Sequence, residues 1–385
     1  MAQSAREPYL LTPGPLTTSI TVKRAMLRDW GSRVQDFIAL NARVRDRLVR
    51  LAGSAGTHVC VPLQGSGTFV VEAMLGTLAP RAGRLLVLVN GAYGARIVRM
   101  ARYHGREVVS LETPEDRPND LAALARALAQ DQAITHVAAV HCETTSGILN
   151  PIEGIAEITA AAGRRLLIDA MSSFGALPLD ARQVPFDAVA ASANKCLEGV
   201  PGVGFALVRQ QALLAAEDNA PALSLDLHDQ WLSMERTGQW RFTPPTHVLA
   251  ALDQALEEHE AEGGVAGRGT RYRANCRILI EGMRDLGFEP LLPDDLQAPG
   301  HCHVPDARRP ALRVRRLLRP AARQGLRDLP GQAHGRAELS HRLHRADRPR
   351  RHARRARRDP GHARRDGRDQ RQARRRCRVT SRGPS

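Results

Sequence analysis

The chain has 385 residues and a formal net charge of +16, which suits two or three domains and suggests a nucleic-acid binder. The charge is confined to one end: residues 1–300 carry 29 basic and 33 acidic side chains, whereas residues 301–385 carry 27 arginines and 7 acidic residues. The first 300 residues therefore have the composition of an ordinary, mildly acidic globular protein, and all of the basic excess lies in the last fifth of the chain.

The six cysteines form no CxxC pair and have no regular spacing, which argues against a zinc site or a disulfide framework and fits a reducing compartment. The N-terminus lacks the charged start and apolar core of a signal peptide, and no uninterrupted apolar run approaches the ~20 residues of a membrane helix. We therefore expect a cytoplasmic protein with no metal site and no membrane association.

From about residue 57 to residue 210, short apolar runs typical of strands alternate with patterns typical of helices. Runs rich in Val, Leu and Ile that are separated by crossover helices predict an α/β fold, with a mostly parallel seven-stranded sheet covered on both faces. The predicted strands are Thr57–Gln64, Arg84–Asn90, Glu107–Glu112, Thr135–Glu143, Arg164–Asp169, Phe186–Ser192 and Val203–Arg209. The predicted helices between them are Phe69–Leu78, Tyr93–His104, Leu121–Gln130 and Ile152–Ala162.

Beyond residue 210 the pattern is mainly helical. One predicted helix begins at Pro244 and Pro245 and ends near Glu262, and a second runs from Arg268 to Gly287. The segment Glu289–Pro299 is the last one with the pattern of a folded protein.

Residues 300–385 are dominated by Arg, Ala, Gly, Pro and His, and they contain no Phe, Tyr, Trp, Ile or Met. Such a segment cannot bury enough apolar surface to offset chain entropy, and it lacks the aromatic residues that stack on nucleic-acid bases. GC-rich codons for three stretches, read in a shifted frame, give ordinary strand and helix sequence: AVPRFAFDAFYDRLRAKG for Arg309–Gly325, GFVIYPGKLT for Gly325–His334 and SFRIGCIG for Glu338–Arg345. We infer a frameshift near Pro299–Gly300, in the gene or in its sequence determination.

Lys195 and Asp169 form the first pair of residues that suggests chemistry. Only two of the 56 basic residues are lysines, Lys23 and Lys195, and lysine, unlike arginine, can lose its proton and act as a nucleophilic amine. Lys195 follows one predicted strand and Asp169 ends another, and parallel sheets bind ligands at the carboxyl ends of their strands. This pair suits pyridoxal phosphate, because the lysine forms a Schiff base with its aldehyde and the carboxylate holds the protonated pyridine nitrogen. Alone, each residue is explained as well by a surface lysine, or by a strand-end cap or metal ligand.

The turn Gln64–Thr68 (QGSGT) follows a predicted strand and opens a predicted helix. Small residues at a helix N-terminus expose backbone N–H groups that bind phosphate, and Ser66 and Thr68 add hydroxyl donors. The turn lacks the lysine-containing loop of nucleoside triphosphatases and the full GxGxxG fingerprint, so on its own it is explained equally by a tight strand–helix connection. The order of phosphate turn, strand-end Asp and strand-end Lys is more specific than any of its parts.

With these parts in this order, the chain resembles the fold-type I pyridoxal-phosphate enzymes, and among them the aminotransferase class that includes the alanine–glyoxylate transaminases. The resemblance covers about residue 8 to residue 299 and is closest to the 2-aminoethylphosphonate–pyruvate transaminases. The motifs that carry it are LLTPGP (10–15), QGSGTF (64–69), NGAYGAR (90–96), ETTSG (143–147), IDAMSS (168–173), SANK (192–195) and RFTPPTH (241–247).

The resemblance implies a role for each matching residue. Lys195 carries the cofactor and moves the substrate proton, Asp169 pairs with the ring nitrogen, and Tyr93 stacks on the ring. The residues expected to hold the cofactor phosphate are Ser66, Gly67, Thr68 and Ser192, with Thr243 reaching the phosphate bound by the partner subunit of a homodimer. Those expected elsewhere around the site are Thr145 near the 3-oxygen of the ring, Asn194 beside the Schiff base, and Pro13, Gly14 and Pro15 at the substrate mouth. Tyr93, Thr145 and Asn194 are otherwise explained as ordinary residues of turns and loops.

The implied reaction transfers the amine of 2-aminoethylphosphonate to pyruvate and gives phosphonoacetaldehyde and L-alanine, a step of phosphonate degradation. Two alternatives stay open: an alanine or serine aminotransferase that uses glyoxylate or pyruvate, and a basic protein that binds nucleic acid through its tail. The family binds the substrate carboxylate with an arginine of the shifted peptide SFRIGCIG. That position falls at Ser340–His341 in the frame as written, so no arginine of this chain is assigned the role.

The resemblance also predicts the domain organisation. We expect an N-terminal arm over residues 1–20, a large pyridoxal-phosphate-binding domain over 21–260, and the start of a small C-terminal α+β domain over 261–299. We expect that domain to be disrupted by an out-of-frame tail without a native fold over residues 300–385.

Overall fold

The computed structural model describes residues 9–10, 12–300 and 326–327. The chain divides into two units, residues 1–335 and 336–385, and every described residue belongs to the first. The predicted tail therefore lies outside the described residues, except for Gly300 and the strand β11 (Leu326–Arg327), which pairs in parallel with β1 (Tyr9–Leu10). No helix of the described residues is long and apolar enough to cross a bilayer.

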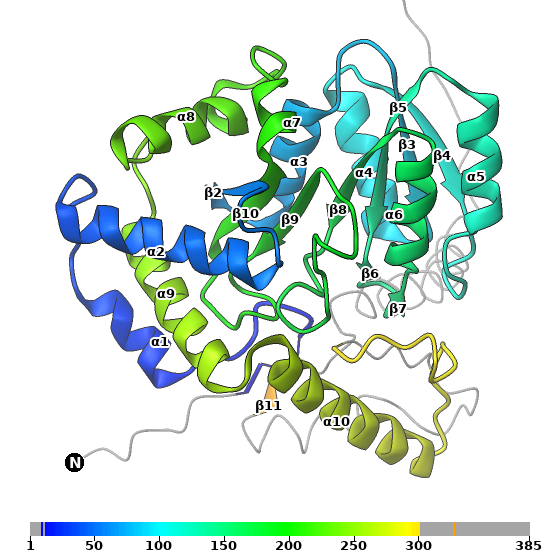
Figure 1. The fold of residues 1–385 in the computed structure, drawn as a ribbon. Coiled ribbons are helices and arrows are strands. Elements are labelled where there is room, and N and C mark those ends of the chain that lie inside the picture. The colour runs from blue at the N-terminus through cyan, green and yellow to red at the C-terminus, as the bar shows by residue number, and fades with distance from the viewer. Residues whose placement is uncertain (1–8, 11, 301–325, 328–385) are drawn as a thin grey trace, which may run out of the picture. The chain divides into compact units, whose positions relative to one another are not determined.

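A seven-stranded sheet organises the described unit (Figure 1). Its strands are β2 (His58–Gly65), β3 (Arg84–Val89), β4 (Glu107–Glu112), β5 (Ile134–Val140), β8 (Arg165–Asp169), β9 (Ala188–Ser192) and β10 (Gly202–Arg209). Their order is β2-β10-β9-β8-β5-β3-β4, and the run from β9 to β4 is parallel. Strand β10 is antiparallel to both of its neighbours, β2 and β9. The prediction of a mostly parallel seven-stranded sheet is confirmed.

Helices cover both faces of this sheet. One face packs against α2 (Gln35–Leu51), α5 (Leu121–Gln130), α6 (Ile152–Ala161) and α9 (Thr246–Ala261). The opposite face packs against α3 (Gly67–Leu78), α4 (Ala92–Tyr103), α7 (Gln210–Leu214) and α8 (Leu227–Thr237). Within β3, Leu86 and Leu88 point into the first core, whereas Leu85 and Val87 point into the second. Because both sets of side chains are buried, the strands are continuously apolar.

The remaining elements are short, except for α10, which follows the last strand of the sheet in the sequence. They are α1 (Ile20–Arg24), η1 (Ala25–Leu27), β6 (Cys142–Glu143), β7 (Ile148–Leu149), η2 (Leu223–Leu225) and α10 (Gly264–Asp285). The predicted strand Thr135–Glu143 is divided in the structure, since β5 ends at Val140 and β6 forms a separate antiparallel pair with β7. Helix α2 was not predicted, although it buries Phe37, Leu40, Val44 and Leu48 at helical spacing. Helix α8 lies in the region that was predicted to be mainly helical, without bounds of its own.

The side chain of Asn150 ties the carboxyl ends of two strands together. Its Nδ2 donates to the carbonyl oxygen of Val140 at the end of β5 (2.9 Å) and to Oδ1 of Asn90, just after β3 (3.2 Å). Its Oδ1 accepts from Nδ2 of Asn90 (2.8 Å) and from the N–H of Asn119 (3.1 Å). Since Asn150 is buried, these bonds fix the edge of the sheet on which the candidate site is built.

Candidate active site

The predicted site residues meet at the carboxyl ends of the parallel strands. Asp169 is the last residue of β8 and Ser192 the last of β9, and Lys195 follows three residues later. Strand β2 runs in the same direction as β9, because both are antiparallel to β10, so its end at Gly65 lies on the same edge. Tyr93 lies in the first turn of α4, directly beyond β3.

Asp169 is a buried carboxylate with an incomplete set of partners. Only 4% of its surface is exposed, and its Oδ1 accepts the N–H of Met171 at 2.9 Å. Its Oδ2 accepts no hydrogen bond from any described residue. Burial raises the pKa of Asp169 to about 6, and Glu143 acts in the same direction, while Lys195 and Arg96 act against it. Such a carboxylate is suited to bind a proton or a cationic N–H group.

The Lys195 amine is also largely buried. Burial lowers the pKa of Lys195 below its ordinary value of 10.5, and the carboxylate of Asp169 partly opposes this shift. Its Nζ donates to the carbonyl oxygen of Pro13 at 3.2 Å. A lysine with a lowered pKa is more often unprotonated near neutral pH and is therefore a better nucleophile.

The N-terminal arm lies directly against this lysine. Gly14 adopts a φ of +149°, and a Cβ atom at this position would come within 2.8 Å of Nζ and 2.5 Å of Cδ of Lys195. Glycine is therefore required, both by its backbone conformation and by its contact with the lysine. The arm leads into α1, whose cap residue Ser19 donates to Glu258 of α9 at 2.8 Å.

The turn before α3 offers hydrogen-bond donors that have no partner among the described residues. Ser66 makes no side-chain capping bond, and its carbonyl oxygen accepts the N–H groups of Phe69 and Val70. This leaves the N–H groups of Gly67 and Thr68 at the start of the helix. A Cβ atom at Gly67 would lie 2.4 Å from Sδ of Met171, so the turn packs closely against the residues that follow Asp169. The hydroxyl groups of Ser66 and Thr68 in this turn, and that of Ser192 at the end of β9, form no hydrogen bond within the described ranges.

Glu143 is a buried residue of the site whose role the sequence did not predict. Its carboxylate accepts the N–H groups of Tyr93 (3.1 Å) and Gly94 (3.3 Å) at the start of α4, where a negative charge is favoured by the helix dipole. It also accepts the hydroxyl of Thr145 at 2.6 Å. A Cβ atom at Gly91 would lie 2.4 Å from the Glu143 side chain, so this glycine permits the close approach. The signal in the sequence that could have identified Glu143 was a carboxylate at the end of the apolar predicted strand Thr135–Glu143.

Tyr93, Thr145 and Asn194 lie near the pair formed by Asp169 and Lys195, but they differ in how they are held. Burial raises the pKa of Tyr93, and the guanidinium of Arg96 lies 4.6 Å from the centre of its ring. Thr145 is fixed by Glu143, as described above. Asn194 is half-buried beside Lys195, and its side chain forms no hydrogen bond in the part of the chain that the structure describes.

Thr243 is not brought together with the other predicted residues within one chain. It is exposed in the segment between α8 and α9, and among the described residues its side chain has no hydrogen-bond partner. Its predicted contact belongs to a second subunit and stays a prediction.

The pKa of Asp169 gives a test of the site in the ligand-free protein. The folded-state pKa of about 6 lies above the ordinary value of 3.8, so folding favours the protonated carboxyl group. That contribution to stability is present below about pH 4 and is lost as the pH rises through about 6. We expect Asp169→Asn to raise the free energy of unfolding by about 2–3 kcal/mol at pH 8, and to change it little at pH 4.

Denaturant unfolding at the two pH values measures this difference. The matched control is Asp116→Asn, which removes an exposed carboxylate and should have the same small effect at both. A stabilisation by Asp169→Asn that does not depend on pH would show that the carboxylate is not strained by its burial.

Comparison with known proteins agrees with this geometry. Residues 25–273 match the family model of class-V aminotransferases. A relative from Burkholderia lata named 2-aminoethylphosphonate–pyruvate transaminase 2 is 53% identical over 330 residues, which are 85% of this chain and 87% of the relative. A relative from Pseudomonas putida named 2-aminoethylphosphonate–pyruvate transaminase is 56% identical over 292 residues, 76% of this chain and 79% of the relative. The resemblance inferred from the sequence motifs is thereby confirmed.

Solved structures confirm the fold. The alanine–glyoxylate aminotransferase of Nostoc sp. superposes with a TM-score of 0.77 at 23% identity, covering 85% of this chain and 87% of the other. The pyridoxamine–pyruvate aminotransferase of Mesorhizobium loti superposes with a TM-score of 0.73 at 26% identity, covering 83% and 82%.

The cofactor implied by this family is pyridoxal phosphate, and the residues present fit it. Among the described residues, one oxygen of Asp169 and the donors around Gly67 have no hydrogen-bond partner, so they suit the ring nitrogen and the phosphate. The largely buried amine of Lys195 suits the aldehyde. These groups stand on one edge of the sheet in the order that the sequence predicts. The chain belongs to the class-V aminotransferases, within the fold-type I enzymes that use pyridoxal phosphate.

Proposed function

We propose that this aminotransferase takes the amine of 2-aminoethylphosphonate and gives it to pyruvate, which yields phosphonoacetaldehyde and L-alanine. The observation that carries the proposal is the 53–56% identity, over most of the chain, to relatives that bear this name. The supporting geometry is the placement of a half-buried lysine and a buried aspartate at the carboxyl ends of β9 and β8.

Lys195 and Asp169 have complementary tasks in this proposal. When bound, the cofactor supplies an electron-withdrawing ring that accepts the electron pair left when the substrate carbon loses its proton. Lys195 would hold the cofactor through its amine, and the same amine would carry that proton. The carboxylate of Asp169 keeps the ring nitrogen protonated.

The other proposed residues bind and orient the cofactor. Those assigned to its phosphate are Ser66, Gly67, Thr68 and Ser192, supported by the hydroxyl and N–H groups that have no partner in the described part of the chain. Tyr93 is proposed to stack on the ring, and Thr145 and Asn194 are proposed to lie beside its reactive edge. The contact of Pro13 and Gly14 with Lys195 supports their placement at the substrate mouth, where the arm with Pro15 would exclude water from the amine.

A homodimer with shared sites is part of the proposal, since Thr243 is exposed and has no partner among the described residues of its own chain. We propose that it reaches the cofactor phosphate of the second subunit. The cytoplasmic location stays a prediction from the sequence.

The resemblance implies an arginine that binds the substrate carboxylate, and no arginine of the described residues is assigned this role. We propose that the frameshift near Pro299–Gly300 has removed it and has disrupted the small C-terminal domain that begins with residues 261–299. The support is the composition of residues 301–385, which hold 27 arginines and none of the apolar aromatics needed for a core.

Replacement of Lys195 tests its assignment. Lys195→Ala should abolish the visible absorbance of the bound cofactor and lower transamination by a factor on the order of 1,000 or more, because the covalent link and the proton carrier are both lost. Lys23→Ala is the matched control, since it removes the only other lysine of the chain. After borohydride reduction of the parent protein, mass spectrometry should find the cofactor on Lys195 and not on Lys23; a reduced adduct on Lys23, or an absorbance that survives in Lys195→Ala, would refute the assignment.

The choice of donor tests the proposed reaction. The cofactor-loaded chain is mixed with 2-aminoethylphosphonate, alanine or serine, and the loss of cofactor absorbance is followed in a single turnover. We expect the aminophosphonate to react at least ~10-fold faster, a difference of about 1.4 kcal/mol in transition-state binding. Faster reaction with alanine or serine would favour the alanine–glyoxylate type of activity instead.

The frameshift is tested by sequencing the DNA around codon 300 and by restoring the frame. We expect the restored chain to complete turnovers with pyruvate at least ~100-fold faster than the chain as written, because a bidentate arginine–carboxylate pair is regained. Equal turnover by the two chains, or a single intact frame in the DNA, would contradict the proposal.

A further inference from the structure

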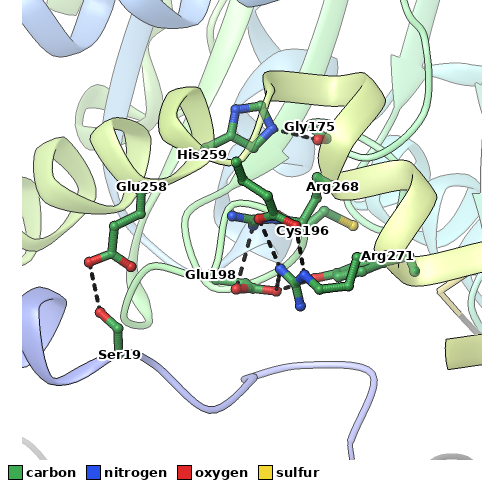
Figure 2. Close-up of polar contacts among 10 residues, drawn as sticks. Ser19, Gly175, Cys196, Glu198, Glu258, His259, Arg268 and Arg271 are labelled. Carbon is green, nitrogen blue, oxygen red and sulfur yellow. Dashed lines mark hydrogen bonds and ion pairs between the residues drawn. The ribbon is translucent and has the colours of Figure 1, made fainter. Parts of the chain in front are cut away.

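A partly buried cluster of charged residues joins α10 to the turn that carries Lys195 (Figure 2). We call it the α10 cluster, and it consists of Glu198 from the turn after Lys195, Glu262 from the end of α9, and Arg268, Arg271 and Tyr272 from α10. None of these residues was predicted to belong to the site.

Arg268 is the buried centre of this cluster, with 2% of its surface exposed. Its Nε donates to the carboxylate of Glu262 at 2.6 Å, and its Nη1 donates to the carbonyl oxygen of Cys196 at 2.5 Å. Nη1 also lies 3.7 Å from the carboxylate of Glu198. Because the guanidinium is planar and rigid, one side chain holds the end of α9 and the residue next to Lys195 in a fixed relation.

The turn after Lys195 needs support from outside its own residues. The carbonyl oxygen of Lys195 accepts the N–H of Glu198 at 2.8 Å, and Glu198 adopts a φ of +59°, which is unfavourable for a residue with a side chain. The carboxylate of Glu198 is held by Arg271 (2.8 Å) and by the hydroxyl of Tyr272 (2.9 Å). The thiol of Cys196 donates to the carbonyl oxygen of Ser172 (3.4 Å), and the Cys196 carbonyl oxygen accepts from Arg268.

The same pair of helices also contacts the turn that follows Asp169. The ring Nε2 of His259, on α9, donates to the carbonyl oxygen of Gly175 at 2.6 Å (Figure 2). A Cβ atom at Gly269 of α10 would lie 2.4 Å from the carbonyl oxygen of Ala176, so the helix packs directly on this backbone. Helices α9 and α10 thus contact both turns that lead from the paired residues Asp169 and Lys195.

We propose that Arg268 is a positioning residue, which acts through the Cys196 carbonyl to fix the turn 195–198 and with it the direction of the Lys195 amine. The proposal rests on the role of Lys195 given above and adds a residue outside the strands that form the site. Arg271 supplies the comparison. It binds the same two carboxylates, Glu198 and Glu262, but does not contact Cys196.

A purely structural role for Arg268 makes a different prediction. If Arg268 served only to neutralise Glu198 and Glu262, its loss and the loss of Arg271 would both weaken the attachment of α10 and leave the Lys195 amine unchanged. If Arg268 positions the turn, its loss alone should let the amine reach water. The amine's own titration distinguishes the two cases, because burial is the largest cause of its lowered pKa.

The experiment compares Arg268→Gln with Arg271→Gln in the full chain without cofactor. Each protein is reductively methylated with formaldehyde and borohydride over a range of pH, and the methylation of Lys195 is measured by mass spectrometry relative to Lys23. The chain is suited to this measurement because it contains no other lysine. The titratable groups that act on the Lys195 amine are Cys196, Asp169, Cys142 and Arg96, and all of them are unchanged in both variants.

We expect the pH midpoint of Lys195 methylation to rise by about one unit in Arg268→Gln and by less than about 0.3 unit in Arg271→Gln. Equal midpoints in the two variants, whether both shifted or both unshifted, would overturn the proposal. If Arg268→Gln does not fold, the same measurement is made on Arg268→Lys. This variant keeps the positive charge beside Glu262, but its ammonium group cannot bind Glu262 and the Cys196 carbonyl as the guanidinium does. A raised midpoint supports the proposal and an unchanged one overturns it.

The measurement uses no cofactor, so its outcome is independent of the reaction proposed for the chain. Failure of the proposed function would be seen in the cofactor adduct on Lys195 and in the donor assay, whereas failure of the positioning role would be seen only in the methylation midpoints.

Discussion

The site depends on a carboxylate that the fold buries without completing its hydrogen bonds. Burying an ionised group stabilises a protein only when partners replace the lost water, and Asp169 has one backbone donor and a cation, Lys195, whose own charge is disfavoured by burial. Each residue therefore makes the other's charged state more favourable, and neither is satisfied. Both side chains lack a full set of partners, which fits a ligand that brings a cationic ring nitrogen to Asp169 and an aldehyde to Lys195.

Local sequence patterns were sufficient to predict the sheet and the pair at its centre. Strands buried on both faces are short apolar runs, and strand-end residues such as Asp169 are visible at their ends without knowledge of the fold. The phosphate turn at Ser66–Thr68 was predicted for the same reason, since small residues between a strand and a helix are a local signal. Predicted helices matched the structure where their apolar faces pack on the sheet, as in α5.

Residues whose role depends on tertiary contacts were not predicted. Glu143 caps α4 from a strand some 50 positions away in the sequence, and Arg268 reaches a backbone carbonyl 72 positions earlier. Neither contact leaves a pattern in its own segment, because the acceptor for Arg268 is a main-chain oxygen that every residue carries. Thr243 marks a different limit, since a contact made by a second subunit has no geometry within one chain.

The reversal of β10 has a consequence for the lysine itself. Helices α4, α5 and α6 carry the chain from β3 to β4, from β4 to β5 and from β5 to β8, and their packing holds these connections in place. Residues 193–201 instead join β9 directly to its antiparallel neighbour, so Lys195 stands on a hairpin loop with no helix of its own. Such a loop must close two strands and present one amine at the same time, which leaves little tolerance for insertion or deletion. Loops usually vary in length among related proteins, but the loop of residues 193–201 is expected to keep its length.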